Sequence, residues 1–258
     1  MSERSQPKDS DLGLLSASQV WTERESFPRH TPADPHNADA LPAYEAAAAR
    51  TLDAVRDTRR FLPGSTYVTF HWALSFYGEY ALAPLLDECA AALAGSGLVP
   101  VSNDRVHVPL LRIGSDADVT EPELHRIEWK TRDWATEQHQ FRLNVGPPVL
   151  GPGGVRLGVA PWTDLIELRN DLRRLTREVL GLRPWLRELV PFRPHVPIAY
   201  APTELPAAPL RARLATAAEH KPVSLRIRRL TLIRIVRTQT EGSWQALADM
   251  TLGKRTSF

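Results

Sequence analysis

The spacing of apolar residues along the chain predicts an alternation of helices and strands. Helices are expected where the sequence is rich in alanine or repeats apolar residues every three or four positions, at about 41–60, 81–94, 121–138, 165–180 and 205–218. Strands are expected in runs of apolar, aromatic and β-branched residues, at about 66–76, 105–113, 140–145, 155–159, 193–200, 223–237 and 244–252. Because hairpins are mixed with helices, the pattern predicts an α+β fold with largely antiparallel sheets.

Glycine, proline and capping residues set the expected ends of these elements. The run GPPVLGPGG at 146–154 predicts a turn between two strands, since neither strand continues easily through it. Thr120 and Glu123 have the spacing of a capping box at the start of the third helix. Residues 1 to about 38 show no apolar period and are expected to form a loose arm or a segment laid over the body, without catalytic residues.

Composition narrows the class of protein. The chain has 258 residues, of which 43% are hydrophobic and 24% charged, which is typical of a globular domain and excludes collagen-like, coiled-coil and wholly disordered chains. The single cysteine, Cys89, excludes an intrachain disulfide and a cysteine-rich metal site. No apolar run approaches the roughly 20 residues of a membrane helix, and the first residues are polar, so we expect a cytoplasmic protein without a membrane partner.

A short internal repeat is the strongest chemical signal. The sequence RVHVPLL at 105–111 recurs as RPHVPIA at 193–199, so that His107 and His195 share the same context. Side chains two apart in a strand share a face, which places His107 with Pro109, and His195 with Pro197. If each copy belongs to one of two related lobes, the histidines meet across a groove and can act as a general acid and base pair.

A structural interpretation of the repeat stays open beside the catalytic one. A lone histidine in a strand is most often a buried residue that is hydrogen-bonded to the backbone, and a duplication preserves packing as well as chemistry. Repetition of the whole context nevertheless favours a functional role for both histidines.

These motifs resemble the 2H phosphoesterases, a superfamily that includes bacterial 2′-5′ RNA ligase-like proteins and cyclic phosphodiesterases. The resemblance rests on the paired histidine motifs, on the strand TYVTFHWALSF and on VSLRIRRLTLIRIVR, and it covers about residues 65–253. It implies a bilobal α+β fold with a pseudo-twofold axis, with two sheets around a central groove and helices outside. It also implies chemistry on 2′,3′-cyclic phosphates or 2′-5′ linkages, with catalytic His107 and His195 and with neither metal nor cofactor.

The chain departs from the family pattern at both motifs. Pro109 and Pro197 stand where the family has threonine or serine, so two hydroxyls that would hold the phosphate are missing. Each lost oxyanion donor typically costs about 10² to 10³ in rate. Arg112 and Tyr200 lie an odd number of residues after their histidines and are expected to face away if the strands are regular.

The aromatic strand offers further groove residues. His71, Thr69 and Ser75 are spaced by even numbers and are expected to line the groove with Pro109 and Pro197, although a histidine packed inside a strand would show the same pattern. We therefore expect three units: an N-terminal arm and helix at 1–64, the 2H phosphoesterase-like domain at 65–253, and a tail at 254–258.

Three functions remain open from the sequence. The first is a metal-independent phosphoesterase acting on a small-molecule or nucleotide substrate. The second keeps the fold and the histidines but carries out isomerisation, cyclisation, elimination or hydrolysis on a nonphosphate metabolite, as the paired prolines indicate. The third is a noncatalytic RNA- or nucleotide-binding protein. A net charge of only +2 gives this function weak support. The residues that would form a basic stripe for RNA are Arg226, Arg228, Arg234 and Arg237.

Overall fold

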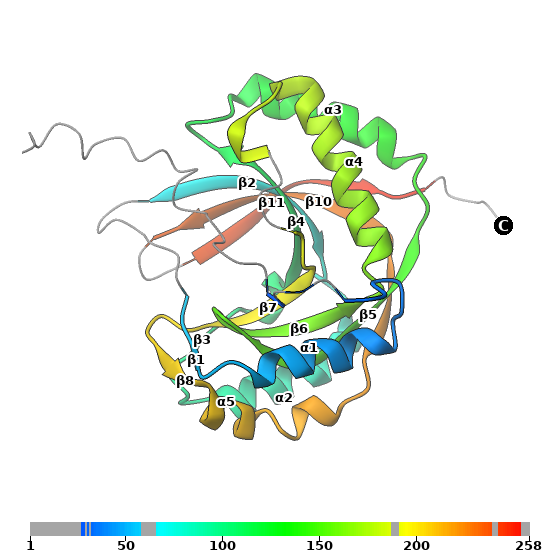
Figure 1. Cartoon of the computed structure of the whole chain (residues 1–258). Coiled ribbons are helices and arrows are strands. Elements are labelled where there is room, and N and C mark those ends of the chain that lie inside the picture. The colour runs from blue at the N-terminus through cyan, green and yellow to red at the C-terminus, as the bar shows by residue number, and fades with distance from the viewer. Residues whose placement is uncertain are drawn as a thin grey trace, which may run out of the picture.

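Two antiparallel sheets form the body of the protein (Figure 1). The computed structural model describes residues 27, 28, 30, 32–57, 66–186, 191–238 and 242–253. The first sheet has the order β11-β10-β2-β4, with bounds β2 Tyr67–Ser75, β4 His107–Ser115, β10 Arg229–Arg237 and β11 Gly242–Thr251. The second sheet has the order β3-β7-β6-β5-β9, with bounds β3 Val99–Pro100, β5 Phe141–Gly151, β6 Gly154–Ala160, β7 His195–Tyr200 and β9 Val223–Ile227. The predicted α+β class with antiparallel sheets is confirmed.

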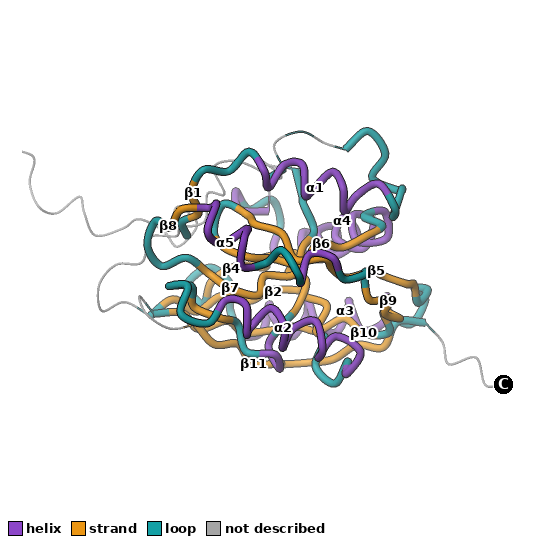
Figure 2. Tube along the Cα trace, turned by 90° about the horizontal axis from the view of Figure 1, so that it is seen from below, coloured by secondary structure: helices purple, strands orange, loops and turns teal. Residues whose placement is uncertain are grey.

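Helices cover both sheets and leave β4 and β7 against each other. The helices are α1 Ala40–Arg50, α2 Ala83–Leu93, α3 Glu121–Ala135, α4 Thr163–Leu180 and α5 Ala207–Arg213. Helices α3 and α4 pack together beside the first sheet, joined by an ion pair of 3.0 Å between Lys130 and Glu178 (Figure 1). Helices α1 and α2 lie on either side of β5, β6 and β7 (Figure 2). Among the described residues, no helix is long and apolar enough to cross a membrane.

The alternating pattern of the motif strands produces the core as expected. Val108 and Leu110 of β4, and Val196 and Ile198 of β7, are all buried in the main hydrophobic cluster. The other face of the first sheet carries a small separate cluster of Ala73, Ile233 and Ile235, against which Trp244 packs. Each motif strand therefore has an apolar face toward the core and a second face that is available for a site.

The first predicted helix was too long, because it ends at Arg50 rather than near residue 60. The Arg211 guanidinium donates hydrogen bonds to the carbonyls of Ala49 and Leu52 at the end of α1. Residues Ala54–Val55 then form β1 and pair with β8 (Leu205–Pro206), which also shortens the predicted helix over 205–218 to α5. Pro63 and Gly64, which were expected to end the first helix, lie outside the described residues.

Two predicted strand boundaries were also wrong. Strand β5 continues through the GPP run to Gly151, with a register shift between Val145 and Pro148, because an irregularity of this kind accommodates prolines that cannot donate to the ladder. The predicted strand over 223–237 divides at Arg228 into β9 and β10, which belong to different sheets. The chain therefore crosses between the sheets at this residue.

The cap of α3 gives a direct stability test. The Glu123 carboxylate accepts hydrogen bonds from the backbone N–H and the hydroxyl of Thr120, as the capping-box spacing indicated. Replacing Thr120 with alanine should lower the free energy of unfolding by about 1 kcal/mol, measured by urea denaturation. The matched change Thr216→Ala removes an exposed threonine without a capping bond and should stay within about 0.5 kcal/mol of the parent. Equal losses in both variants would contradict the assignment of the cap.

Candidate functional site

The two motif histidines are held in the same way. His107 begins β4 and His195 begins β7, and each places its Nδ1 atom 2.8 Å from the backbone oxygen of the residue two positions earlier, Arg105 or Arg193. Because a carbonyl only accepts hydrogen bonds, each Nδ1 carries the proton, and the Nε2 atom of the neutral ring keeps its lone pair. The internal repeat therefore extends from the sequence to the orientation of the imidazole rings.

Each motif strand also contains a β-bulge at the same position. In the pairing of β2 with β4, Ala73 lies opposite Pro109 and Trp72 opposite Leu111, which leaves Leu110 as the extra residue. In the pairing of β6 with β7, Arg156 lies opposite Pro197 and Val155 opposite Ala199, which leaves Ile198 as the extra residue. Because a bulge inserts one extra residue, every side chain after it lies on the opposite face of the sheet from the one it would occupy in a regular strand.

The bulges overturn the expectation that Arg112 and Tyr200 face away from the histidines. Arg112 lies opposite His71, and His71 shares its face with Ala73 and Ser75, the latter opposite His107. By the same argument Tyr200, opposite Gly154, shares the face of His195. The expectation assumed regular strands, and one extra residue between each histidine and the fifth residue after it, Leu110 or Ile198, reverses it.

The histidine-bearing faces of the two sheets meet. Arg237 of β10 places its guanidinium carbon 5.5 Å from the ring centroid of Tyr200 in β7, so a side chain of the first sheet contacts one of the second. The charge of His107 lowers the pKa of both His195 and His71, which places the three imidazoles within electrostatic reach of one another. The site is therefore shared between both sheets.

Burial keeps these histidines neutral. It lowers the pKa of His195 to about 3, with a further decrease from the Arg156 guanidinium, and lowers that of His71 to about 3, with a further decrease from Arg112. The pKa of His107 is also lowered by burial, although its hydrogen bond to the Arg105 carbonyl opposes the shift. Around neutral pH the site therefore presents unprotonated Nε2 atoms beside positive guanidinium groups.

The remaining candidates from the sequence lie on the same faces. Ser75 is opposite His107, while Thr69 is buried and lies 3.0 Å from His71, between its Oγ1 and the imidazole Nε2. Pro109 lies half-buried beside His107, and Pro197 lies buried opposite Arg156. No residue of this set projects from the other face of its sheet.

Sequence reasoning missed three residues of the site. Trp244 lies with its ring 5.7 Å from that of His107 and donates its indole N–H to the same Arg105 carbonyl that accepts from His107. Arg156 lies on β6 opposite Pro197, and Glu45 of α1 approaches it to 3.4 Å. The pairing of β6 with β7 and the docking of α1 bring these residues in, and neither is visible as a spacing in the sequence.

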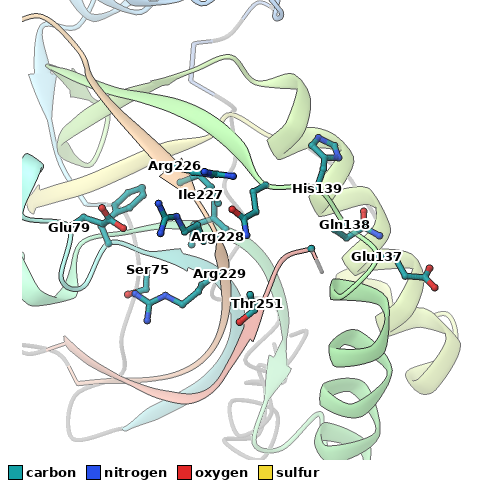
Figure 3. Close-up of a pocket in the computed structure, with 14 residues that line it drawn as sticks. Ser75, Glu79, Glu137, Gln138, His139, Arg226, Ile227, Arg228, Arg229 and Thr251 are labelled. Atoms are coloured by element: carbon teal, nitrogen blue, oxygen red, sulfur yellow. The ribbon is translucent and has the colours of Figure 1, made fainter. Parts of the chain in front are cut away.

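A separate cavity of about 840 Å³ lies where the chain crosses from β9 to β10 (Figure 3). Its lining includes Ser75, Arg226, Arg228 and Arg229, so it reaches the strand partner of His107. The proposed basic stripe is not continuous, because Arg226 belongs to the second sheet and Arg234 faces away from Arg237 within β10. Arg226 and Arg228 nevertheless lie together in the lining of this cavity.

Comparison with known proteins places the chain in a family. Residues 81–239, which include both motif histidines, match the model of the 2′-5′ RNA ligase superfamily. A search among curated proteins finds no match.

Solved structures show the same fold. TT0787 of Thermus thermophilus superposes with a TM-score of 0.53 at 20% identity, covering 71% of this chain and 97% of that protein. The apo form of E. coli LigT gives a TM-score of 0.51 at 18% identity, covering 74% of this chain and 100% of LigT. LigT has also been crystallised with 3′-AMP. The matched segment exceeds half of the chain, and the chain belongs to the 2′-5′ RNA ligase superfamily, that of the 2H phosphoesterases.

Proposed function

We propose that the protein is a metal-independent phosphoesterase that hydrolyses a 2′,3′-cyclic phosphate or a 2′-5′ phosphodiester. The observation that carries the proposal is the identical clamping of His107 and His195, which leaves both Nε2 atoms available at the place where the two sheets meet. A pair of imidazoles on opposite sides of one phosphorus atom supplies a base for the attacking water and an acid for the leaving oxygen.

The electrostatics favour His195 as the base and His107 as the acid. His195 has its pKa lowered to about 3 by burial and by Arg156, so it is unprotonated and accepts the proton of the attacking water. The pKa of His107 is also lowered by burial, and the carbonyl clamp opposes the decrease at both histidines, but only at His195 does a guanidinium, that of Arg156, lower the pKa further. In the fraction of molecules whose His107 ring is protonated, water oxygen bonds to phosphorus as the bond to the leaving ribose oxygen breaks. His195 takes the proton of the water, and His107 delivers its Nε2 proton to the leaving oxygen. Proton exchange with solvent then restores both rings.

Arg112 and Ser75 are the proposed substitutes for the missing hydroxyls. The bulge brings Arg112 to the His107 face, where its Nε atom is buried and has no hydrogen-bond partner within the described parts of the chain. Ser75 places a hydroxyl directly across the ladder from His107. A guanidinium donates to phosphate oxygens with a full positive charge, which compensates for the neutral donors that Pro109 and Pro197 lack.

A second candidate, a reaction on a nonphosphate metabolite, is favoured by the charge balance around the arginines. Arg112 lies 3.5 Å from Asp118, and Arg156 lies 3.4 Å from Glu45. Each guanidinium therefore already has a carboxylate partner, which reduces its attraction for a phosphate. The two candidates differ in whether Arg112 contacts the reacting group and in whether the protein hydrolyses a cyclic phosphate.

The central prediction concerns the histidines. Purified protein should hydrolyse a nucleoside 2′,3′-cyclic phosphate with EDTA present, and His107→Ala or His195→Ala should each lower kcat by about 10² to 10⁴, because each removes an acid or base catalyst. Product formation is followed by chromatography. His125→Ala, which removes an exposed histidine of α3 away from the site and from the cavity of Figure 3, is the control and should keep the parent rate. Full activity in either motif variant would contradict the proposal.

The pH profile tests the assignment of acid and base. Because the pKa of His107 lies below the ordinary 6.5 and the acid must carry a proton, kcat/KM should fall about tenfold per pH unit above about pH 6.5. The acid limb, which reports His195, should lie near pH 3. A rate that rises through pH 7 to a plateau would instead require an acid with a raised pKa and would reject the assignment.

Substitution of Arg112 tests its role as an oxyanion donor. Arg112→Gln should lower kcat on the cyclic phosphate by about 10² to 10³ through loss of an oxyanion donor. The double variant Pro109→Thr with Pro197→Thr should preserve or raise phosphoesterase activity, since it restores the family's hydroxyls. Undiminished turnover of the cyclic phosphate in Arg112→Gln would contradict the role of Arg112 as an oxyanion donor. The nonphosphate candidate instead predicts that the parent protein itself does not hydrolyse the cyclic phosphate.

A further inference from the structure

A buried carboxylate from α1 lies beside His195. Glu45 is only 1% exposed, and its Oε1 atom lies 3.4 Å from Nη2 of Arg156. Its Oε2 atom lies in the space that a side chain at position 158 would fill, because a Cβ added to Gly158 would come within 2.2 Å of this atom. Gly158 is the strand partner of His195, so Glu45 lies on the histidine face of the second sheet.

The segment before α1 covers the same arginine. Nη1 of Arg156 donates a hydrogen bond of 2.9 Å to the carbonyl of Phe27, and its guanidinium carbon lies 5.1 Å from the Phe27 ring centroid. Arg193 donates from Nε to the carbonyl of Pro28, while its own carbonyl holds His195. The Tyr44 hydroxyl of α1 donates to the His30 carbonyl. Phe27, Pro28 and Glu45 therefore form a cover, named here the N-terminal cover, over Arg156 and Arg193.

The first sheet has no equivalent arrangement at Arg112 among the described residues. The Asp118 carboxylate that approaches Arg112 to 3.5 Å also accepts shorter hydrogen bonds from the backbone N–H and the hydroxyl of Ser115. Arg112 therefore shares its counter-charge, whereas Arg156 has a carboxylate, a backbone carbonyl and an aromatic ring on it. The two sides of the site therefore differ in how far the positive charge of the arginine is compensated.

We propose that Glu45 is a specificity-determining residue whose pairing with Arg156, under the N-terminal cover, makes the second-sheet side of the site accept an uncharged group of the substrate. The first-sheet side, with Arg112, then receives the single negative charge of the phosphodiester. The substrate class is a phosphodiester whose second-sheet flank is an uncharged nucleoside sugar or base, rather than one with a further phosphate there. This specificity rests on the proposed function. Glu45, Phe27 and Pro28 lie outside residues 81–239, so the device belongs to this chain and not to the matched segment.

The physical basis is the balance of charge in a buried setting. Above its pKa, which burial raises to about 7, the ionised Glu45 carboxylate beside the guanidinium leaves little net field, and a ligand anion would have to displace Glu45 and the Phe27 carbonyl to bind Arg156. Removing only the carboxylate charge leaves a guanidinium that attracts anions strongly, whereas removing both partners leaves the net charge of the pair unchanged.

The test measures binding of inorganic phosphate by calorimetry at constant ionic strength and about pH 8, above the pKa of Glu45, which burial raises to about 7. Glu45→Gln should bind phosphate at least about tenfold more tightly than the parent, because the carboxylate no longer compensates the positive charge of Arg156. The paired variant Glu45→Met with Arg156→Met should bind within about twofold of the parent. Glu128→Gln, which breaks the exposed ion pair of Glu128 with Arg132, is the matched control and should change nothing.

Each outcome decides the proposal. Unchanged or weaker phosphate binding in Glu45→Gln overturns it, as does a tenfold loss in the paired Met variant, which would make Arg156 a phosphate ligand. The paired variant keeps the test decisive if Glu45→Gln does not fold. Failure of the proposed function has a different signature: the histidine variants then lose no turnover, while the phosphate affinities still report on Glu45 and Arg156.

Discussion

The hydrogen bond from each motif histidine to the carbonyl two residues before it is the interaction on which the site depends. Each bond fixes the ring, its tautomer and the direction of Nε2 at the first residue of a strand. Because β4 and β7 lie against each other where the sheets meet, two such rings share one space. At the first histidine, Trp244 donates its indole N–H to the same Arg105 carbonyl, and its ring makes a T-shaped contact with that of His107.

Each motif proline directly precedes a bulge. Proline has no N–H for the ladder, and sheets accommodate it at edges and irregularities. Pro109 and Pro197 are each followed immediately by the extra residue of a bulge, Leu110 or Ile198. The change that removes the family's hydroxyl therefore coincides with the change that turns the fifth residue after the histidine, Arg112 or Tyr200, toward the site. One side gains a cation and the other an aromatic ring, so duplicated motifs give an asymmetric site.

The sequence predicted the elements and the paired histidines because both depend on local pattern. The apolar stripe of α4 and the capping box of α3 depend on residues close together in the sequence, and the repeat around the two histidines is apparent from the sequence itself. The end of α1 at Arg50 depends on Arg211, which is distant in sequence, and the direction of Arg112 depends on one unpaired residue in a ladder. Glu45 and Arg156 come together only after a helix docks on a sheet. Side-chain direction beyond a bulge and contacts between distant elements depend on the tertiary structure. The hydrophobic pattern within one segment of the sequence does not predict them.

The most direct test of the central claim is the response of the imidazole nitrogens to an anion. Long-range nitrogen-15 NMR of the protein should show His107 and His195 with the proton on Nδ1, and added phosphate should shift the Nε2 resonances of both rings along one binding curve. That result would establish that two clamped histidines face a single anion. Nε2 resonances that shift for one ring only, or for neither, would contradict the account, as would a proton on Nε2 in the neutral state.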